Sequence, residues 1–264
     1  MRVKCALPLV AGFVLVLCAS ELLAQKEFDA AQEKITAYWN ERSPVSKDPV
    51  KMAKVLKDFN ELPGQVRPLI DSGILSYLNS SHTISPDELT IKIAKALAYP
   101  YMSVNSLADA DGKVSVISLP HRSGYAIAYD VGTCASCSTS WVRIAARRDD
   151  HWVLTDHLDN PVKDNAVHLA WAGSKADPLL AIYGMHWGDA HNRLDVRLYS
   201  VQNGIKEVWS SLNLYEGEIA IHENRITLTY WTEPRPPYRE KVQVFEVAGL
   251  LVKLLQTKLS DIQR

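Results

Sequence analysis

The sequence lacks the short motifs that mark common enzyme classes. It contains no G-x-S-x-G, S-x-x-K, H-E-x-x-H or G-x-G-x-x-G pattern, so the local signatures of serine hydrolases, zinc proteases and dinucleotide-binding enzymes are excluded. It also lacks an excess of charge of one sign, because 29 Lys and Arg residues oppose 30 Asp and Glu residues. Nucleic acids and anionic membranes require a basic patch, so we expect neither as a partner. The missing motifs favour a non-catalytic role.

Cysteine is scarce, and two of the four cysteines lie in an N-terminal segment that has the layout of a signal peptide. Arg2 and Lys4 precede an apolar run from Cys5 to Cys18 that is too short to span a bilayer. The pattern predicts an exported protein, periplasmic or extracellular, from which residues 1–24 are removed. No transmembrane span is expected in the mature chain.

The cleavage site of this segment, and whether a lipid is attached to it, are left open by the sequence. Cleavage after Ala24 or after Ser20 would each place a small residue at the cut. A lipid anchor on Cys18 is another alternative, although Leu17 stands where such sites usually carry a small residue.

Residues 25–105 are predicted to form a helical region. Apolar residues recur there at helical spacing in two stripes, Phe28, Ala31, Ile35 and Tyr38, and then Met52, Leu56, Phe59 and Leu62. Two helix starts carry a capping residue followed by proline, Asp48 with Pro49 and Ser85 with Pro86. A further helix over residues 66–78 is expected to be broken or loosened near Gly73.

Residues 113–258 are predicted to form an antiparallel β domain. Short alternating runs rich in Val, Ile, Tyr and Trp are separated there by turn residues. Three similar hairpins begin at Val142, Val196 and Val242, and each follows two more strand-like runs. This pattern gives three four-stranded repeats over about residues 113–160, 166–212 and 217–257. The predicted fold class is therefore α+β.

Antiparallel units of four strands at this spacing resemble the blades of a β-propeller. The resemblance is one of architecture and points to no named family, because no blade motif such as a repeated Trp-Asp pair is present. Propellers usually close with four to eight blades, so three imply an incomplete ring with the helical region covering an exposed blade. A twisted β-sandwich is the alternative.

The repeat alignment places three loops between the second and third strands of their units. They contain "GTCASCST" from Gly132, "HWGDAH" from His186 and "TEPRPPYRE" from Thr232. Equivalent turns of neighbouring blades lie on one rim, where exposed aromatic rings and charges could stack on a sugar or hold a peptide. The predicted ligand-binding residues are Trp187, Asp189, Trp231, Glu233, Arg235 and Tyr238. For the two tryptophans the alternative is that they fill the core.

Cys134 and Cys137 form a C-x-x-C pair in the first loop. An exported protein meets an oxidising compartment, and a tight turn brings its ends within disulfide range, so a disulfide is the leading interpretation. The alternative is zinc bound by both cysteines together with His186 and His191. A redox role is disfavoured, because strands rather than a helix N-terminus flank the pair.

These observations predict an exported, non-catalytic binding or scaffold module that uses the rim loops to hold a protein, peptide or carbohydrate. No cofactor is expected in this interpretation. The rival hypothesis is a metal-dependent enzyme, possibly a hydrolase, with a zinc site of Cys and His residues on the rim. A structural protein with no small-molecule site is a third alternative.

Overall fold

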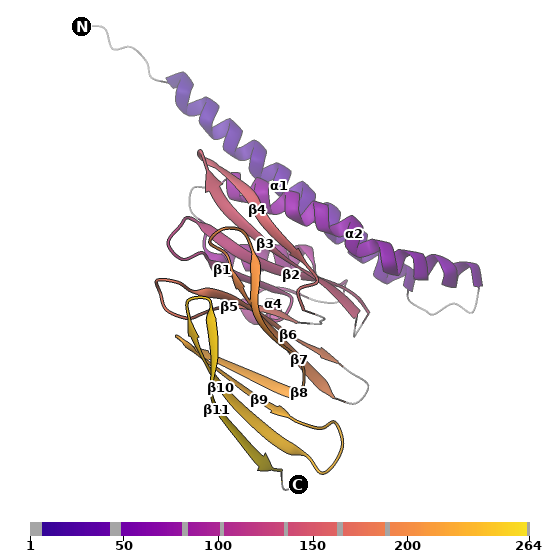
Figure 1. The fold of residues 1–264 in the computed structure, drawn as a ribbon. Helices are drawn as coiled ribbons and strands as arrows, with labels where there is room; N and C mark the ends of the chain where they lie inside the picture. Colours follow the sequence, from indigo (N-terminus) through magenta and orange to yellow (C-terminus); the bar gives the residue numbers. More distant parts are fainter. Residues whose placement is uncertain are drawn as a thin grey trace. The chain divides into compact units, whose positions relative to one another are not determined.

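The computed structural model shows an N-terminal helical region followed by two antiparallel sheets, which confirms the predicted α+β class (Figure 1). It describes residues 7–42, 49–80, 84–100, 103–134, 137–162, 166–187 and 191–262. The chain divides into two compact units. The helical unit comprises Met1–Asp109 and Arg147–Val153, and the β unit comprises Ala110–Ala146 and Leu154–Arg264.

Three long helices form the helical unit, α1 (Leu7–Arg42), α2 (Pro49–Ser80) and α3 (Pro86–Ala96). The first predicted stripe is buried, because Phe28, Ala31, Ile35 and Tyr38 are each no more than 5% exposed. Helix α2 contributes the buried residues Leu62, Val66, Ile70, Ile74 and Leu78. In the second predicted stripe Leu62 is buried and Phe59 half-buried, whereas the side chains of Met52 and Leu56 lie outside the described ones.

The predicted helix starts are found at both prolines. Ser85 caps α3, because its hydroxyl oxygen accepts a hydrogen bond from the backbone N–H of Glu88 at 3.1 Å. Pro86 occupies the first turn, where its missing N–H costs nothing. Helix α2 begins at Pro49, while Asp48 lies outside the described residues. A short helix, α4 (Leu107–Ala110), ends the helical region.

The expected break near Gly73 is wrong, because α2 is one helix of 32 residues that continues through Pro63, Pro68 and Gly73. Helix packing explains why position 73 is a glycine. A Cβ at position 73 would lie 2.7 Å from Cε1 of Phe28, so only glycine leaves room for that buried ring. The residue permits close approach of α1 to α2 and does not end the helix.

The β unit contains a four-stranded and a seven-stranded antiparallel sheet, each with its strands in sequence order. The first comprises β1 (Val114–Ser118), β2 (Gly124–Cys134), β3 (Cys137–Arg148) and β4 (His151–Asp159). The second comprises β5 (Val167–Ala172), β6 (Leu179–Trp187), β7 (Asn192–Ser200), β8 (Lys206–His222), β9 (Arg225–Trp231), β10 (Arg239–Ala248) and β11 (Leu251–Asp261).

The predicted blade repeats are not confirmed, because the second and third units share one strand. The expected boundary between residues 212 and 217 lies inside β8, a continuous strand of 17 residues. Its residues 206–215 pair with β7, and its residues 215–222 pair with β9. Asn and Gly occur both in turns and in bulges, so Asn213 and Gly217 are consistent with a bulged strand as well as with a boundary between repeats. Across the described strands both sheets are open, and no propeller closes.

Hydrophobic cores cover both faces of the seven-stranded sheet at β6. Leu180 and Ile182 join a core with residues of β2 and β3, so the four-stranded sheet packs on this face. Leu179 and Ala181 point the opposite way, as alternate strand residues must, and join a core with residues of β9 and β10. The seven-stranded sheet therefore bends back on itself to bury its second face.

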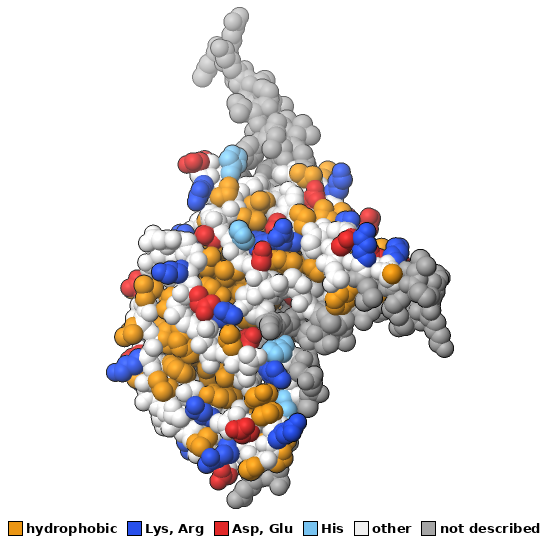
Figure 2. All heavy atoms as spheres, turned by 45° about the vertical axis from the view of Figure 1, so that its right-hand side comes forward, with side chains coloured by type: hydrophobic (Ala, Val, Ile, Leu, Met, Phe, Trp, Pro, Cys, Tyr) orange, Lys and Arg blue, Asp and Glu red, His pale blue; other side chains and the backbone are white. Residues whose placement is uncertain are grey.

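The surface of the β unit carries hydrophobic side chains gathered over the strands, with charged side chains around them (Figure 2). The last strand region contributes five exposed leucines, Leu250, Leu251, Leu254, Leu255 and Leu259. Among the described residues, no helix has both the length and the apolar character needed to cross a membrane.

The close approach at Gly73 predicts opposite effects for two alanine substitutions in α2. Gly73→Ala forces the new methyl group into the buried Phe28 ring and is expected to lower the free energy of unfolding by about 1–3 kcal/mol. Gly64→Ala is the matched control, because a Cβ there meets no atom within 4 Å; this change is expected to stabilise by about 0.5–1 kcal/mol. Urea unfolding followed by circular dichroism measures both. Equal effects would contradict the packing role of Gly73.

Candidate functional site

Strand register brings two of the three predicted rim loops together. The β6–β7 loop ends at the start of β7, and the β9–β10 loop begins at the end of β9. Between them lies β8, where Tyr215 pairs with Arg193 of β7 on one side and with Trp231 of β9 on the other. The two loops therefore emerge at the same edge of the sheet, next to the middle of β8.

Four rings meet at this edge. The ring centroid of His191 lies 5.5 Å from that of Trp231, 6.2 Å from Tyr238 and 6.4 Å from Tyr215, each in an edge-to-face arrangement. Trp231 and Tyr238 lie 4.4 Å apart. Such geometry is favourable for aromatic pairs beyond the area it buries. We call these four residues, together with Glu216, the rim cluster.

Glu216 holds the histidine of the rim cluster in place. Its Oε1 lies 3.1 Å from Nδ1 of His191 and accepts a hydrogen bond from the backbone N–H of Asn192 at 3.3 Å. The side chains of His191 and Glu216 are 17% and 32% exposed, so the pair is reachable from solvent. The guanidinium of Arg193 lies 5.1 Å from the centroid of the Tyr215 ring and adds a cation beside the cluster.

A bulged bend in β8 places Tyr215 and Glu216 next to His191. Register shifts flank the bend on both of its partner strands, and Asn213 and Glu216 have positive φ values of 59° and 44°. Buried Asp195 accepts a hydrogen bond from the backbone N–H of Asn213 at 2.7 Å. Gly217 is required where the strands approach, because a Cβ there would lie 2.7 Å from Cβ of Leu194.

The structure brings together part of the predicted ligand-binding set. Trp231 and Tyr238 belong to the rim cluster and are half-buried, while Glu233 and Arg235 are exposed on the same loop. The backbone of Trp187 ends β6, but its side chain lies outside the described ones, as does the whole of Asp189.

Sequence reasoning missed Tyr215 and Glu216. Both lie between residues 212 and 217, at the predicted boundary between the second and third repeats. The glycine after Glu216 was the available signal, because a glycine within a strand-like run often marks a bulge.

The C-x-x-C pair flanks the β2–β3 turn, where Cys134 and Cys137 are register partners. Their side chains lie outside the described ones. Of the histidines in the zinc alternative, His186 is half-buried and His191 is engaged with Glu216. Within the described residues no group of three His, Cys, Asp or Glu side chains could hold a metal ion. The disulfide and the zinc alternative both stay predictions.

A buried carboxyl group lies on β2, four residues before Cys134. Burial raises the pKa of Asp130 to about 8, although the positive charge of Lys113 opposes the shift. The backbone N–H of Asp130 donates to the carbonyl oxygen of Lys113 at 3.0 Å, which keeps the two residues adjacent. Burial in turn lowers the pKa of the Lys113 ammonium. Such a shifted carboxyl group marks a candidate site but equally occurs in structural pairs.

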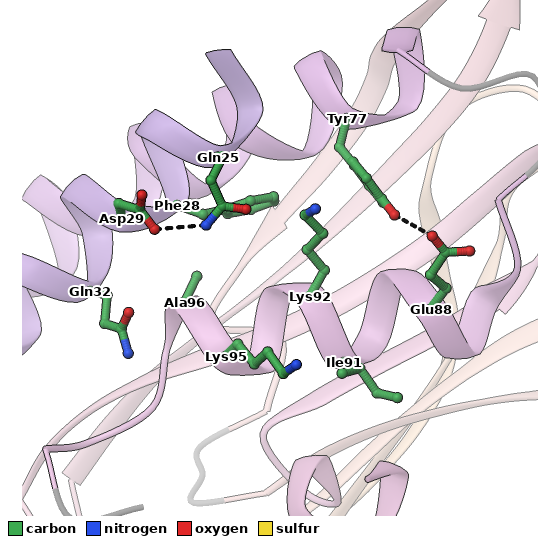
Figure 3. Close-up of a pocket in the computed structure, with 10 residues that line it drawn as sticks. All are labelled: Gln25, Phe28, Asp29, Gln32, Tyr77, Glu88, Ile91, Lys92, Lys95 and Ala96. Carbon is green, nitrogen blue, oxygen red and sulfur yellow. Dashed lines mark hydrogen bonds between the residues drawn. The ribbon is translucent and has the colours of Figure 1, made fainter. Parts of the chain in front are cut away.

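The helical unit contains a pocket of about 470 Å³ that the sequence did not indicate. Helix α1 contributes Gln25 and Asp29 to its wall, and α3 contributes Lys92 and Lys95. In Figure 3, Lys92 extends from α3 toward Phe28 and Tyr77. The volume lies within the range of small-molecule sites.

Comparison of the chain with protein-family models, with curated protein sequences and with solved structures gives no match. Any functional inference therefore depends on the residues and geometry described above.

The raised pKa of Asp130 predicts a specific pH dependence of stability. Between pH about 4 and about 8 the folded protein keeps a proton on Asp130 that the unfolded chain releases, so this residue lowers stability as pH rises through that window. Asp130→Asn removes this contribution. Relative to the variant, wild type should lose up to about 1.4 kcal/mol of unfolding free energy per pH unit. Urea titrations from pH 4 to 9 measure the difference, and a pH-independent difference would contradict the burial argument.

Proposed function

We propose that this protein is an exported, non-catalytic binding module that holds a peptide or carbohydrate ligand at the rim cluster. The observation that carries the proposal is the meeting of His191 and Tyr238, from two loops, with Trp231 at the end of β9 and with Tyr215 and Glu216 of the bulged strand. Aromatic side chains offer large contact area at low entropic cost, and they are enriched at binding sites. The half-exposed carboxylate supplies an acceptor for ligand hydroxyl or amide groups.

The proposal extends to the architecture. We interpret the β unit as three open, blade-like layers, of which the second and third share β8. Support comes from the pairing of β8, which changes from β7 to β9 at Tyr215, and from the cores on both faces of β6. Layers arranged in this way leave the second-to-third strand loops of the second and third layers at one edge for ligand contact.

Replacing Tyr238 tests the rim cluster. Tyr238→Ala removes a ring that contacts both Trp231 and His191, and it is expected to weaken ligand binding at least tenfold. Glycan and peptide arrays probed with the wild-type protein identify the ligand class, and titration with the best ligand then compares the variants. Ligand quenching of tryptophan fluorescence that is lost in Trp231→Phe would place the ligand near Trp231, one of seven tryptophans in the chain.

Leu255→Ala is the control, because it removes an exposed apolar side chain on β11, outside the rim cluster. It should leave affinity unchanged. Wild-type protein that binds nothing on either array, or a Tyr238→Ala variant that binds as tightly as wild type, would refute the proposed function.

We also propose that Cys134 and Cys137 form a disulfide that pins the β2–β3 turn. Register partners in an antiparallel ladder have Cα atoms about 4.5–5.5 Å apart, within the range a disulfide bridges. Closing so short a loop stabilises by only about 2 kcal/mol.

Protein expressed with its export segment is therefore expected to show no reactive thiol and a mass lower by two hydrogen atoms than the reduced form. Cys134→Ser is expected to release one titratable thiol. Two free thiols with bound zinc would contradict the disulfide and favour the metal alternative, and loss of that zinc in His191→Ala would identify its ligands.

A further inference from the structure

Two polar stripes face each other across the pocket of the helical unit. Gln25, Asp29 and Gln32 follow one another at i, i+4 and i+7 on α1, and Glu88, Lys92 and Lys95 repeat the same spacing on α3. Residues at this spacing lie on one face of a helix. The pocket therefore has an α1 wall with one carboxylate and an α3 wall with two ammonium groups and the carboxylate of Glu88.

The charged groups of these walls do not neutralise each other across the space. Asp29 accepts a hydrogen bond from Nε2 of Gln25 at 2.7 Å, along its own helix (Figure 3). The ammonium of Lys92 lies 4.3 Å from the centroid of the Tyr77 ring. Within the described residues, Asp29 makes no ion pair with Lys92 or Lys95. Charge of each sign is thus available to a bound molecule.

Tyr77 and Glu88 close one end of the pocket. The Tyr77 hydroxyl donates a hydrogen bond to Oε1 of Glu88, and burial followed by this bond raises the pKa of the phenol. Tyr77 thus stays neutral and engages one of the two carboxylate oxygens of Glu88. Phe28, which is 2% exposed, supplies an apolar surface beside the polar walls. Asp29, which accepts a hydrogen bond from Gln25 of its own helix, is the acceptor for a ligand cation on the α1 wall, and the two lysines are donors to a ligand anion.

We propose that this pocket binds a small zwitterion with one ammonium and one carboxylate group, the chemistry of a free amino acid or short peptide. The ligand ammonium pairs with Asp29, its carboxylate pairs with Lys92 and Lys95, and its apolar part lies against Phe28. A pocket of about 470 Å³ accommodates a molecule of this size. Every lining residue follows Ala24, so the predicted export cleavage keeps all of them, with Gln25 as the first residue of the mature chain. The inference goes beyond the rim proposal, because it concerns a different unit.

The test uses three matched probes and the full chain expressed with its export segment. L-leucyl-L-leucine carries both charges, its N-acetyl form lacks the ammonium, and its C-terminal amide lacks the carboxylate. Isothermal titration of the wild-type protein should show the free dipeptide binding at least tenfold more tightly than either modified form. Asp29→Asn should abolish the preference over the N-acetyl form, and Lys92→Gln combined with Lys95→Gln should abolish the preference over the amide.

Two controls assign the result to this pocket. Lys57→Gln alters an exposed lysine of α2 that does not line the pocket and should leave the affinities unchanged. Leu255→Ala alters an exposed residue of β11, outside both the pocket and the rim cluster, and should also leave dipeptide binding intact. Loss of these preferences in the Asp29 and lysine variants assigns the dipeptide to the helical pocket and separates this proposal from the rim proposal. The inference is overturned if the wild-type protein does not bind the dipeptide at millimolar concentration. It is also overturned if either modified form binds as tightly as the free dipeptide. These wild-type measurements decide the matter even if a variant does not fold.

Discussion

The bulged bend of β8 is the constraint on which the rest of the β unit depends. At Tyr215 the strand stops pairing with β7 and starts pairing with β9, so one strand serves two differently oriented parts of the sheet. Positive φ values at Asn213 and Glu216 make the bend possible, at a cost for residues other than glycine. The buried Asp195 carboxylate offsets part of that cost by accepting from the Asn213 N–H, and Gly217 admits Leu194.

The same bend determines both the rim cluster and the hydrophobic core on the second face of the seven-stranded sheet. Because β9 and β10 turn back toward β6, Ile226, Leu228 and Phe245 bury the second face of the seven-stranded sheet. Because the turn occurs at Tyr215, the residues next to it reach the ends of β9 and the start of β7. Stability and the candidate site thus share their structural cause. Substitutions within the bend cannot separate a binding role from a folding role, whereas the loop residue Tyr238 can.

Residue spacing within a helix made the helices predictable, whereas the rim cluster was predicted only in part because strand register decides which residues meet there. The burial of Phe28 and Ile35 and the cap at Ser85 follow from spacing and from side-chain chemistry within one turn. The contact of His191 with Glu216 depends on a bulge register between strands, and no spacing in the sequence encodes it. The pocket was missed for a different reason. A stripe of Gln and Asp is common on the solvent-exposed face of a helix. Only the packing of α1 against α3 places this stripe opposite two lysines.

The two candidate sites would recognise ligands by different physics. The rim cluster is preorganised, because its rings hold one another edge-to-face and Glu216 is fixed by two hydrogen-bond contacts, so little entropy is lost when a ligand stacks there. The lysine side chains of the helical pocket would lose conformational entropy on binding an anion. Charge pairing with the ligand would have to compensate for that entropy loss. In the two proposals, apolar contact area would therefore set affinity at the rim, and charge placement would set selectivity in the pocket. The two sites are built from different residues, so ligands bound there would not compete for one surface.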